Sequence, residues 1–310
     1  MTPRSWAAAL PLAAVITVGA ATADAQHTFR SGVDVVRVDA LVTNGHLGIT
    51  GLRPGDFELR DNGVLQKIDA IALESLPLTV TFVLDTSGSV AGGKMQHLAS
   101  AVDMVLRGLR AQDHVGLVTF SHRVWQRVPL TPDVDQVRRL LTAAEAAGGT
   151  ALNDAVYAGL ALSESQESRA LVLVFSDGLD NASWLGEETV ERAARRADAV
   201  VYGVAVAAKT SLVATRINGV PSARVKPEYA RGQTDFLEAI ASATGGRLVK
   251  ADTTDDLPKA FEEILQEFRT RYVLSYSPAG VDTPGWHAID VKVKGRSATV
   301  TARRGYERGR

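Results

Sequence analysis

Long apolar runs alternate with amphipathic stretches through the middle of this 310-residue chain. Leu78–Leu84 and Arg169–Phe175 are almost entirely apolar or β-branched, which is typical of strands buried on both faces of a parallel sheet. Met95–Arg110 and Leu257–Phe268 instead have the apolar spacing of helices that pack on one side. The alternation over residues 76–270 therefore predicts an α/β domain with a doubly wound, mostly parallel sheet.

One pair of strands should break the parallel pattern. His114–Ser121 and Val124–Leu130 are both strand candidates, and only a tight turn at 121–123 separates them. Such a short connection fits a hairpin and not a crossover. We therefore expect one antiparallel strand at the edge of the sheet.

The two ends of the chain have the shorter alternation of half-buried strands. Val33–Val42, Phe57–Arg60 and Val64–Ala72 are the candidates near the amino end, and residues 271–310 contain three more. Each end has too few strands to bury an apolar face alone. We therefore expect residues 26–75 and 271–310 to pair into one small β domain.

Residues 1–25 have the pattern of a secretory signal peptide. Arg4 supplies the positive start, Trp6–Ala21 the apolar core, and Ala23-Asp24-Ala25 an A-x-A cleavage site. An uncleaved anchor is the alternative, but the core is short, rich in Ala and interrupted by Pro11. We expect a mature protein without a membrane span that is secreted or periplasmic.

Charge and cysteine content narrow the possible partners. The 34 Lys and Arg nearly balance the 35 Asp and Glu, so no general field draws the chain to nucleic acid or to an anionic membrane. The chain has no Cys, so export brings no disulfides and stability must come from the core.

Oxygen-bearing side chains follow directly after the two buried-strand patterns. Asp85, Ser87 and Ser89 follow the first, and Asp177 follows the second, while Thr150 lies on a Gly-Gly-Thr turn. Ligands of open α/β sheets bind beyond the carboxyl ends of the strands, where these side chains can converge. Carboxylates and hydroxyls suit Mg²⁺, Mn²⁺ or Ca²⁺, and the lack of Cys and of clustered His argues against zinc or copper. The sequence therefore predicts a hard-metal site.

The order of these motifs, D-x-S-x-S, then G-G-T, then S-D-G, resembles the von Willebrand factor type A domain and its metal-ion-dependent adhesion site. The resemblance implies that five residues coordinate the metal: Asp85, Ser87, Ser89, Thr150 and Asp177. The opening phrase Val-Asp-Val-Val-Arg-Val and the closing phrases Tyr-Val-Leu-Ser-Tyr-Ser-Pro and Arg-Arg-Gly-Tyr are similar to those of a bacterial exported group, the von Willebrand type A-related proteins.

A phosphate-binding loop is a rival interpretation of the same stretch. Gly88 to Lys94 satisfies G-x-x-x-x-G-K after a strand. That loop needs Ser or Thr after the Lys to hold Mg²⁺, and here the residue is Met95. The expected export also argues against a nucleotide site, because ATP is scarce outside the cytoplasm.

The ligand set indicates what the metal would do. Only two carboxylates offset its charge, so the ion keeps its attraction for another anionic oxygen, and one of its waters can yield to a partner's Asp or Glu. Type A domains are known for such adhesion, so we expect a metal-dependent protein-binding module and not an enzyme. Metal-assisted hydrolysis and a structural scaffold with a fixed metal are the alternatives. The motifs contain no extra base for hydrolysis, and His97 falls inside the first helix.

A long stretch after the strand Ala199–Ala207 should begin at the metal edge. Residues 209–232 are polar and lack clear periodicity, so we expect a loop there. Its charged residues are Lys209, Arg216, Arg224, Lys226 and Arg231 against Glu228. Two interpretations stay open: a rim that steers an acidic partner, or a solvated connection.

The loop after Asp177 also holds candidates with more than one interpretation. Trp184 either packs on the sheet or projects beside the metal. Asn181-Ala-Ser183 matches a glycosylation acceptor, which is a weak signal alone. Asn153 and Asp154 open a helix, where an acid favours the helix dipole, and we prefer that role to a metal role.

Overall fold

The computed structural model describes residues 35–308, apart from 46, 74–75, 164–167, 208, 218–219 and 229–230, and within 209–231 it describes the backbone alone. The expected signal peptide at residues 1–25 lies outside this part of the chain. No helix in the described part is long and apolar enough to cross a membrane.

A six-stranded sheet forms the centre of the main domain, in the order β13-β10-β9-β6-β7-β8. All neighbouring pairs are parallel except β7 and β8, which are antiparallel. The expected antiparallel edge strand is therefore confirmed. The strands are β6 (Leu78–Asp85), β7 (His114–Phe120), β8 (Val124–Thr131), β9 (Arg169–Ser176), β10 (Ala199–Val206) and β13 (Leu248–Ala251).

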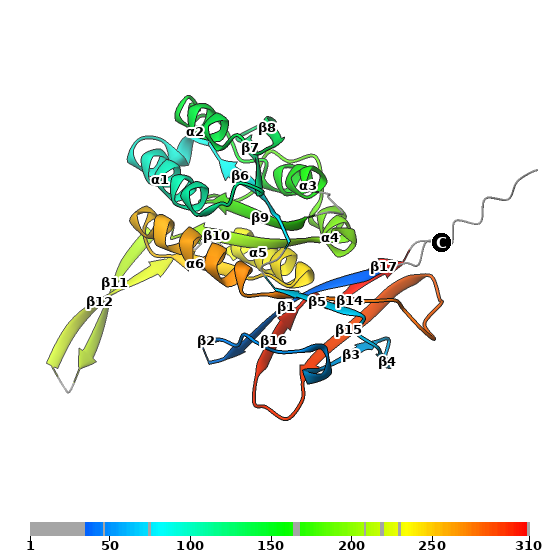
Figure 1. Cartoon of the computed structure of the whole chain (residues 1–310). Coiled ribbons are helices and arrows are strands. Elements are labelled where there is room, and N and C mark those ends of the chain that lie inside the picture. The colour runs from blue at the N-terminus through cyan, green and yellow to red at the C-terminus, as the bar shows by residue number, and fades with distance from the viewer. Residues whose placement is uncertain are drawn as a thin grey trace, which may run out of the picture. The chain divides into compact units, whose positions relative to one another are not determined.

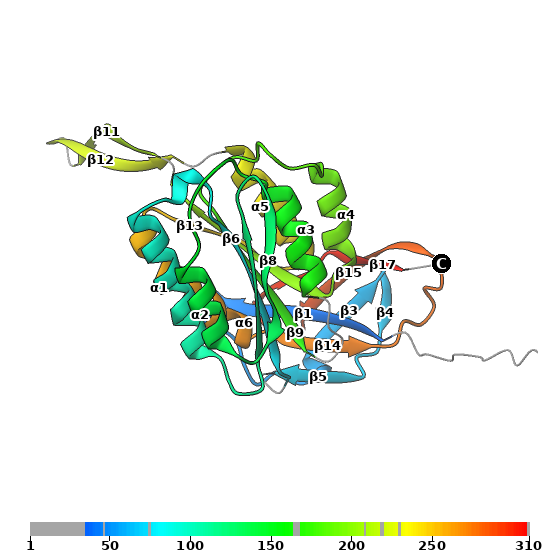
Figure 2. The same cartoon turned by 90° about the horizontal axis from the view of Figure 1, so that it is seen from above.

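Helices cover both faces of this sheet, as Figure 2 shows from above. One apolar cluster joins α1, α2 and α6 to the sheet, and a second joins α3, α4 and α5 to the other face. Every residue of β6, β9 and β10 is buried, because both faces of these strands are covered. The helices are α1 (Gly93–Gly108), α2 (Val134–Thr142), α3 (Leu152–Leu162), α4 (Glu187–Arg196), α5 (Arg231–Thr244) and α6 (Leu257–Arg269).

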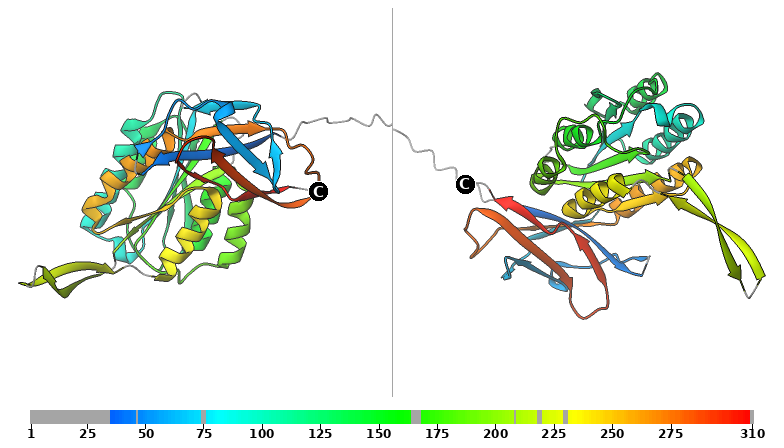
Figure 3. Two further views of the ribbon diagram at one scale, coloured as in Figure 1. Left: turned by 90° about the horizontal axis from the view of Figure 1, so that it is seen from below. Right: turned by 180° about the vertical axis from the view of Figure 1, so that it is seen from behind.

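The two chain ends pair, as expected, but they form two sheets (Figure 3). The first has the order β16-β1-β14-β5 with β2 on β1, and the second has the order β17-β15-β3-β4. Residues of both sheets share one apolar core. The strands are β1 (Val36–Asn44), β2 (Leu47–Gly48), β3 (Phe57–Asp61), β4 (Val64–Gln66), β5 (Ala70–Leu73), β14 (Tyr272–Tyr276), β15 (Gly285–Val293), β16 (Thr299–Ala302) and β17 (Gly305–Arg308).

The single strand expected over Val64–Ala72 is wrong, because the chain changes sheets there. β4 pairs with β3 in one sheet, and β5 pairs with β14 in the other. Gln66, the last residue of β4, is anchored where the chain leaves this sheet, because its side chain donates to the carbonyl of Ala279 at 3.0 Å. Apolar alternation continues through the crossing, so it gives no sign of the change.

The loop expected over residues 209–232 is also wrong. β11 (Lys209–Ile217) and β12 (Val220–Glu228) form a two-stranded antiparallel sheet, and α5 begins at Arg231 (Figure 1). A hairpin signal was present, because Asn218-Gly219 is a preferred two-residue turn between β-rich runs. The side chains that would form a basic rim lie outside the described residues.

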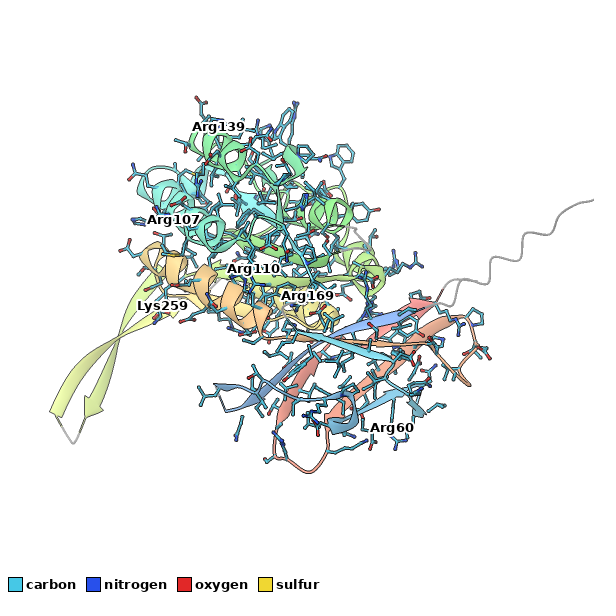
Figure 4. All side chains as sticks on the ribbon, viewed as in Figure 1. Arg60, Arg107, Arg110, Arg139, Arg169 and Lys259 are labelled. Carbon is cyan, nitrogen blue, oxygen red and sulfur yellow. The ribbon has the colours of Figure 1, made fainter. Side chains whose placement is uncertain are left out.

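The β domain contacts the end of the main sheet that is opposite the metal motifs. Arg169, labelled in Figure 4, stands at the start of β9, and its Nη2 lies 2.6 Å from Asp39 Oδ1 of β1. The carboxyl end of the same strand carries Ser176, beside Asp177. The expected metal edge therefore lies at the opposite end of the strands from the β domain.

Candidate metal centre

Two neighbouring strands bring the acidic motifs together. β6 ends at Asp85, and β9 ends at Ser176, directly before Asp177. The two strands are parallel and adjacent, with Leu84 opposite Phe175. Their polar end residues therefore lie side by side at one sheet edge, as the sequence predicts.

Asp85 is fully buried, and the groups that donate hydrogen bonds to its carboxylate are uncharged. Its Oδ1 accepts the backbone N–H of Ser87 at 2.8 Å, and its Oδ2 accepts the hydroxyl of Ser176 at 2.7 Å. Burial raises the pKa of the Asp85 carboxyl, and the charge of Asp177 adds to this, although hydrogen bonds from Ser176 and Ser87 act in the opposite direction. The ionised form of Asp85 is therefore short of compensation.

A chain of short polar contacts joins the serines to the second acid. Ser87 Oγ lies 3.0 Å from Ser89 Oγ, and Ser89 donates to Asp177 Oδ1 at 2.5 Å. The other Asp177 oxygen lies 2.9 Å from Lys94 Nζ. Three of the expected ligands therefore form one connected group, with a side-chain cation attached to it.

The Gly-Gly-Thr turn carries Thr150 to the same place. Gly148 has φ +84°, a left-handed conformation that favours Gly, and its carbonyl accepts the N–H of Gly88 at 3.1 Å. A Cβ placed on Gly178 would lie 3.3 Å from Thr150 Oγ1 and 3.9 Å from Ser89 Oγ. Both hydroxyls therefore face the same small space beside Gly178, and all five expected residues come to one edge.

Three residues support this edge in ways that the sequence analysis missed. Ser176 holds Asp85, and Lys94 pairs with Asp177. Asn181 forms two hydrogen bonds with the backbone of Thr150. The Asn181 Oδ1 accepts the Thr150 N–H, and the Asn181 backbone N–H donates to the Thr150 carbonyl, both at 2.9 Å. Their positions within or beside the motifs were visible, but their partners were not.

The loop after Asp177 is tied to the start of α3. Asp154 accepts the N–H groups of Trp184 and Leu185, so it holds this loop, and Asn153 donates to the Leu185 carbonyl at 3.0 Å. Trp184 is 95% exposed, which decides against packing on the sheet. Asp154 therefore stands in the first turn of α3, where an acid favours the helix dipole, and it also holds the loop.

The donor set fits a hard divalent cation. The described residues contain no cluster of three or more His, Cys, Asp and Glu side chains. At this edge, carboxylate oxygens from Asp85 and Asp177 stand with hydroxyls from Ser87, Ser89 and Thr150, all of which are donors that Mg²⁺ accepts. These residues would hold the ion, and two acids would offset its charge.

The comparisons with known proteins identify the class. The family model of the von Willebrand factor type A domain matches residues 80–179. This part of the chain is therefore a von Willebrand factor type A domain, and the resemblance stated above is confirmed. The matched range includes all five expected metal residues.

Individual relatives agree with this assignment. Human inter-alpha-trypsin inhibitor heavy chain H4 is 25% identical over 266 residues, which is 80% of this chain and 27% of the relative. Human heavy chain H2 is 30% identical over 119 residues, 34% of this chain and 13% of the relative. The chain thus spans only about a quarter of H4.

A solved structure shows the same fold. The von Willebrand factor type A protein from Catenulispora acidiphila superposes with a TM-score of 0.51 at 13% identity, covering 81% of this chain and 72% of that one. The α/β fold with additional antiparallel sheets is therefore confirmed. Function has to be argued from the site itself.

Proposed function

We propose that this protein is an exported protein-binding module that uses a divalent cation, Mg²⁺ or Mn²⁺ (or Ca²⁺), to bind an Asp or Glu of a partner protein. The observation that carries the proposal is the convergence of Asp85, Ser87, Ser89, Thr150 and Asp177 at one sheet edge. The signal-like pattern of residues 1–25 supports a secreted or periplasmic location.

The charge balance of the site favours an acidic ligand. Two carboxylates neutralise a divalent ion, but the Lys94 ammonium already compensates part of the Asp177 charge. The loaded site would therefore carry net positive charge. A carboxylate from a partner restores neutrality and supplies the anionic oxygen that a hard cation prefers.

Binding fits the surroundings better than hydrolysis does. Water activation needs a base close to the metal-bound water. His97 is engaged elsewhere, since its ring nitrogens lie 2.9 Å from Thr254 Oγ1 and 3.0 Å from Asp255 Oδ1. Ser176 and Asn181 are likewise engaged in holding Asp85 and Thr150. These contacts support binding over hydrolysis as the action of the site.

Affinity capture tests the proposal. The immobilised mature protein is incubated with the extracytoplasmic fraction of its source, in Mg²⁺ or in EDTA. The partner should be retained in Mg²⁺ and lost in EDTA or with Asp85→Ala. The control is Asp282→Ala, which removes an acid that is 84% exposed and pairs with Arg308 in the β domain. Capture that is equal in Mg²⁺, in EDTA and with Asp85→Ala would contradict the proposal.

A further inference from the structure

Lys94 forms an ion pair in which the two partners differ in exposure. Its Nζ lies 2.9 Å from Asp177 Oδ2, and the Lys94 side chain is 44% exposed whereas that of Asp177 is only 3% exposed. The two residues are 83 positions apart in the chain. A half-exposed ammonium therefore compensates a nearly buried carboxylate.

The position of Lys94 in its helix is electrostatically unfavourable. It is the second residue of α1, which begins at Gly93. The amino end of a helix carries partial positive charge and favours acids over bases. Helix stability does not explain a cation at this place, so the contact with Asp177 is its main electrostatic compensation.

The same carboxylate belongs to the proposed metal ligands. Asp177 Oδ1 accepts the Ser89 hydroxyl, and Oδ2 holds the ammonium. A divalent ion beside Ser89 and Asp177 would lie a few ångströms from that ammonium. The two cations therefore compete for the negative charge of one carboxylate.

We propose that Lys94 is a built-in competitor for the divalent cation, which keeps Asp177 compensated before the metal binds and weakens the affinity of the site for the metal. This inference rests on the proposed function. The half-exposed stem lets the ammonium give up the Asp177 oxygen to the metal while it stays within a few ångströms of the site. Lys94 thus sets how much metal the protein needs before it can bind its partner.

The size of the effect follows from Coulomb repulsion. The ammonium carries one positive charge and the metal ion two. At about 5 Å in a medium with the dielectric constant of water, their repulsion changes an equilibrium constant by about tenfold. Removing the ammonium should therefore tighten metal binding by about tenfold or more.

The test compares two Lys→Met variants with the wild-type protein. Lys94→Met removes the competitor. Lys259→Met is the matched control, because Lys259, labelled in Figure 4, lies on α6 and pairs at 3.8 Å with Glu263, so the change in net charge is the same. Mg²⁺ affinity is measured by titration calorimetry, and thermal unfolding is measured in EDTA.

Lys94→Met should bind Mg²⁺ about tenfold more tightly than wild type, and it should unfold at a lower temperature in EDTA because Asp177 loses its counter-ion. Lys259→Met should leave the Mg²⁺ affinity unchanged. Equal or weaker Mg²⁺ binding by Lys94→Met, with clear binding by wild type, overturns this inference and leaves the proposed function intact. A lack of binding by wild type and both variants overturns both.

Discussion

Two fully buried carboxylates in this molecule have very different surroundings. Asp61 lies in the β domain and Asp85 at the carboxyl edge of the main sheet, and both are 0% exposed. His287 Nδ1 lies 2.8 Å from Asp61 Oδ1, and the hydroxyls of Tyr276 and Tyr306 donate to Asp61 Oδ2 at 2.8 and 3.0 Å. Asp85 instead receives a backbone N–H and a serine hydroxyl.

The contacts of His287 sharpen this contrast. Its Nδ1 faces the Asp61 carboxylate, and its Nε2 lies 2.6 Å from the carbonyl oxygen of Thr283. Both neighbours are hydrogen-bond acceptors that face the imidazole ring. The Asp61 carboxylate therefore has a buried imidazole and two hydroxyl donors around it.

The difference separates structure from function. The Asp61 group joins β3, β14, β15 and β17, and three side chains surround its carboxylate, so it stabilises the β domain. At Asp85 burial raises the carboxyl pKa, and a second acid, Asp177, stands nearby. Asp177 has the Lys94 ammonium, but Asp85 is held by neutral donors alone, so this edge has negative charge to offer a cation.

The largest expected effect comes from breaking the compensated group. Asp61→Asn removes a buried ionic acceptor that His287, Tyr276 and Tyr306 share, so it should lower the free energy of unfolding by about 3 to 5 kcal/mol. Chemical denaturation of the mature protein measures this. A loss below about 1 kcal/mol would mean that the His287 pair contributes no more than an exposed one.

Metal should stabilise the other region. Mg²⁺ at a hundredfold excess over its dissociation constant should raise the free energy of unfolding by about 2.7 kcal/mol, because it binds only the folded site. The Asp61→Asn protein should gain as much as wild type, whereas Asp85→Asn should gain nothing. Thermal unfolding with and without Mg²⁺ measures the gains, and an equal gain in Asp85→Asn would contradict the assigned ligands.

Replacing Asp61 or Asp85 with Asn should change the free energy of unfolding in opposite directions when EDTA is present. The folded pKa of Asp85 is raised above its ordinary value of 3.8, so the folded state retains a proton that the unfolded state releases. Wild-type stability relative to Asp85→Asn should therefore fall as pH rises from about 3.8 through the raised pKa. Asp85→Asn should be the more stable protein at pH 7, and denaturation curves from pH 3.5 to 7 check this. A less stable Asp85→Asn at pH 7 would show that the acid is well compensated.

The smallest change in the free energy of unfolding should come from removing one hydroxyl that donates to Asp61. Burial and Asp61 raise the pKa of Tyr306 to about 12, so its hydroxyl stays a donor at neutral pH. Tyr306→Phe should cost about 1 kcal/mol, because His287 and Tyr276 remain on the carboxylate. If denaturation shows a cost as large as that of Asp61→Asn, the group depends on each donor and not mainly on the ion pair.

Local patterns predicted most of the main sheet and the five edge residues. Short β-branched apolar runs such as Leu78–Leu84 favour buried strands, and a polar residue at the end of such a run marks the carboxyl edge. Motif order then placed Thr150 with them. The separate strands β4 and β5 were not predicted, because sheet membership depends on partners elsewhere in the chain.

The side chains that contact the buried acids could not be predicted from the sequence in the same way. His287 lies 226 residues from Asp61 in the chain, and Lys94 lies 83 residues from Asp177. Neither spacing has a periodic signal, because strand register and loop packing decide which side chains meet. Only the three-dimensional arrangement shows which buried acid is compensated and which is not.

Anomalous scattering from a crystal of the mature protein soaked in Mn²⁺ tests most directly whether the five assigned residues hold a metal ion. We expect an anomalous difference peak at the carboxyl edge of the main sheet, within coordination distance of Ser87 Oγ and Ser89 Oγ, that is lost in Asp85→Asn crystals. The absence of a peak at this edge, or a peak held by other residues while this edge stays empty, would contradict this assignment.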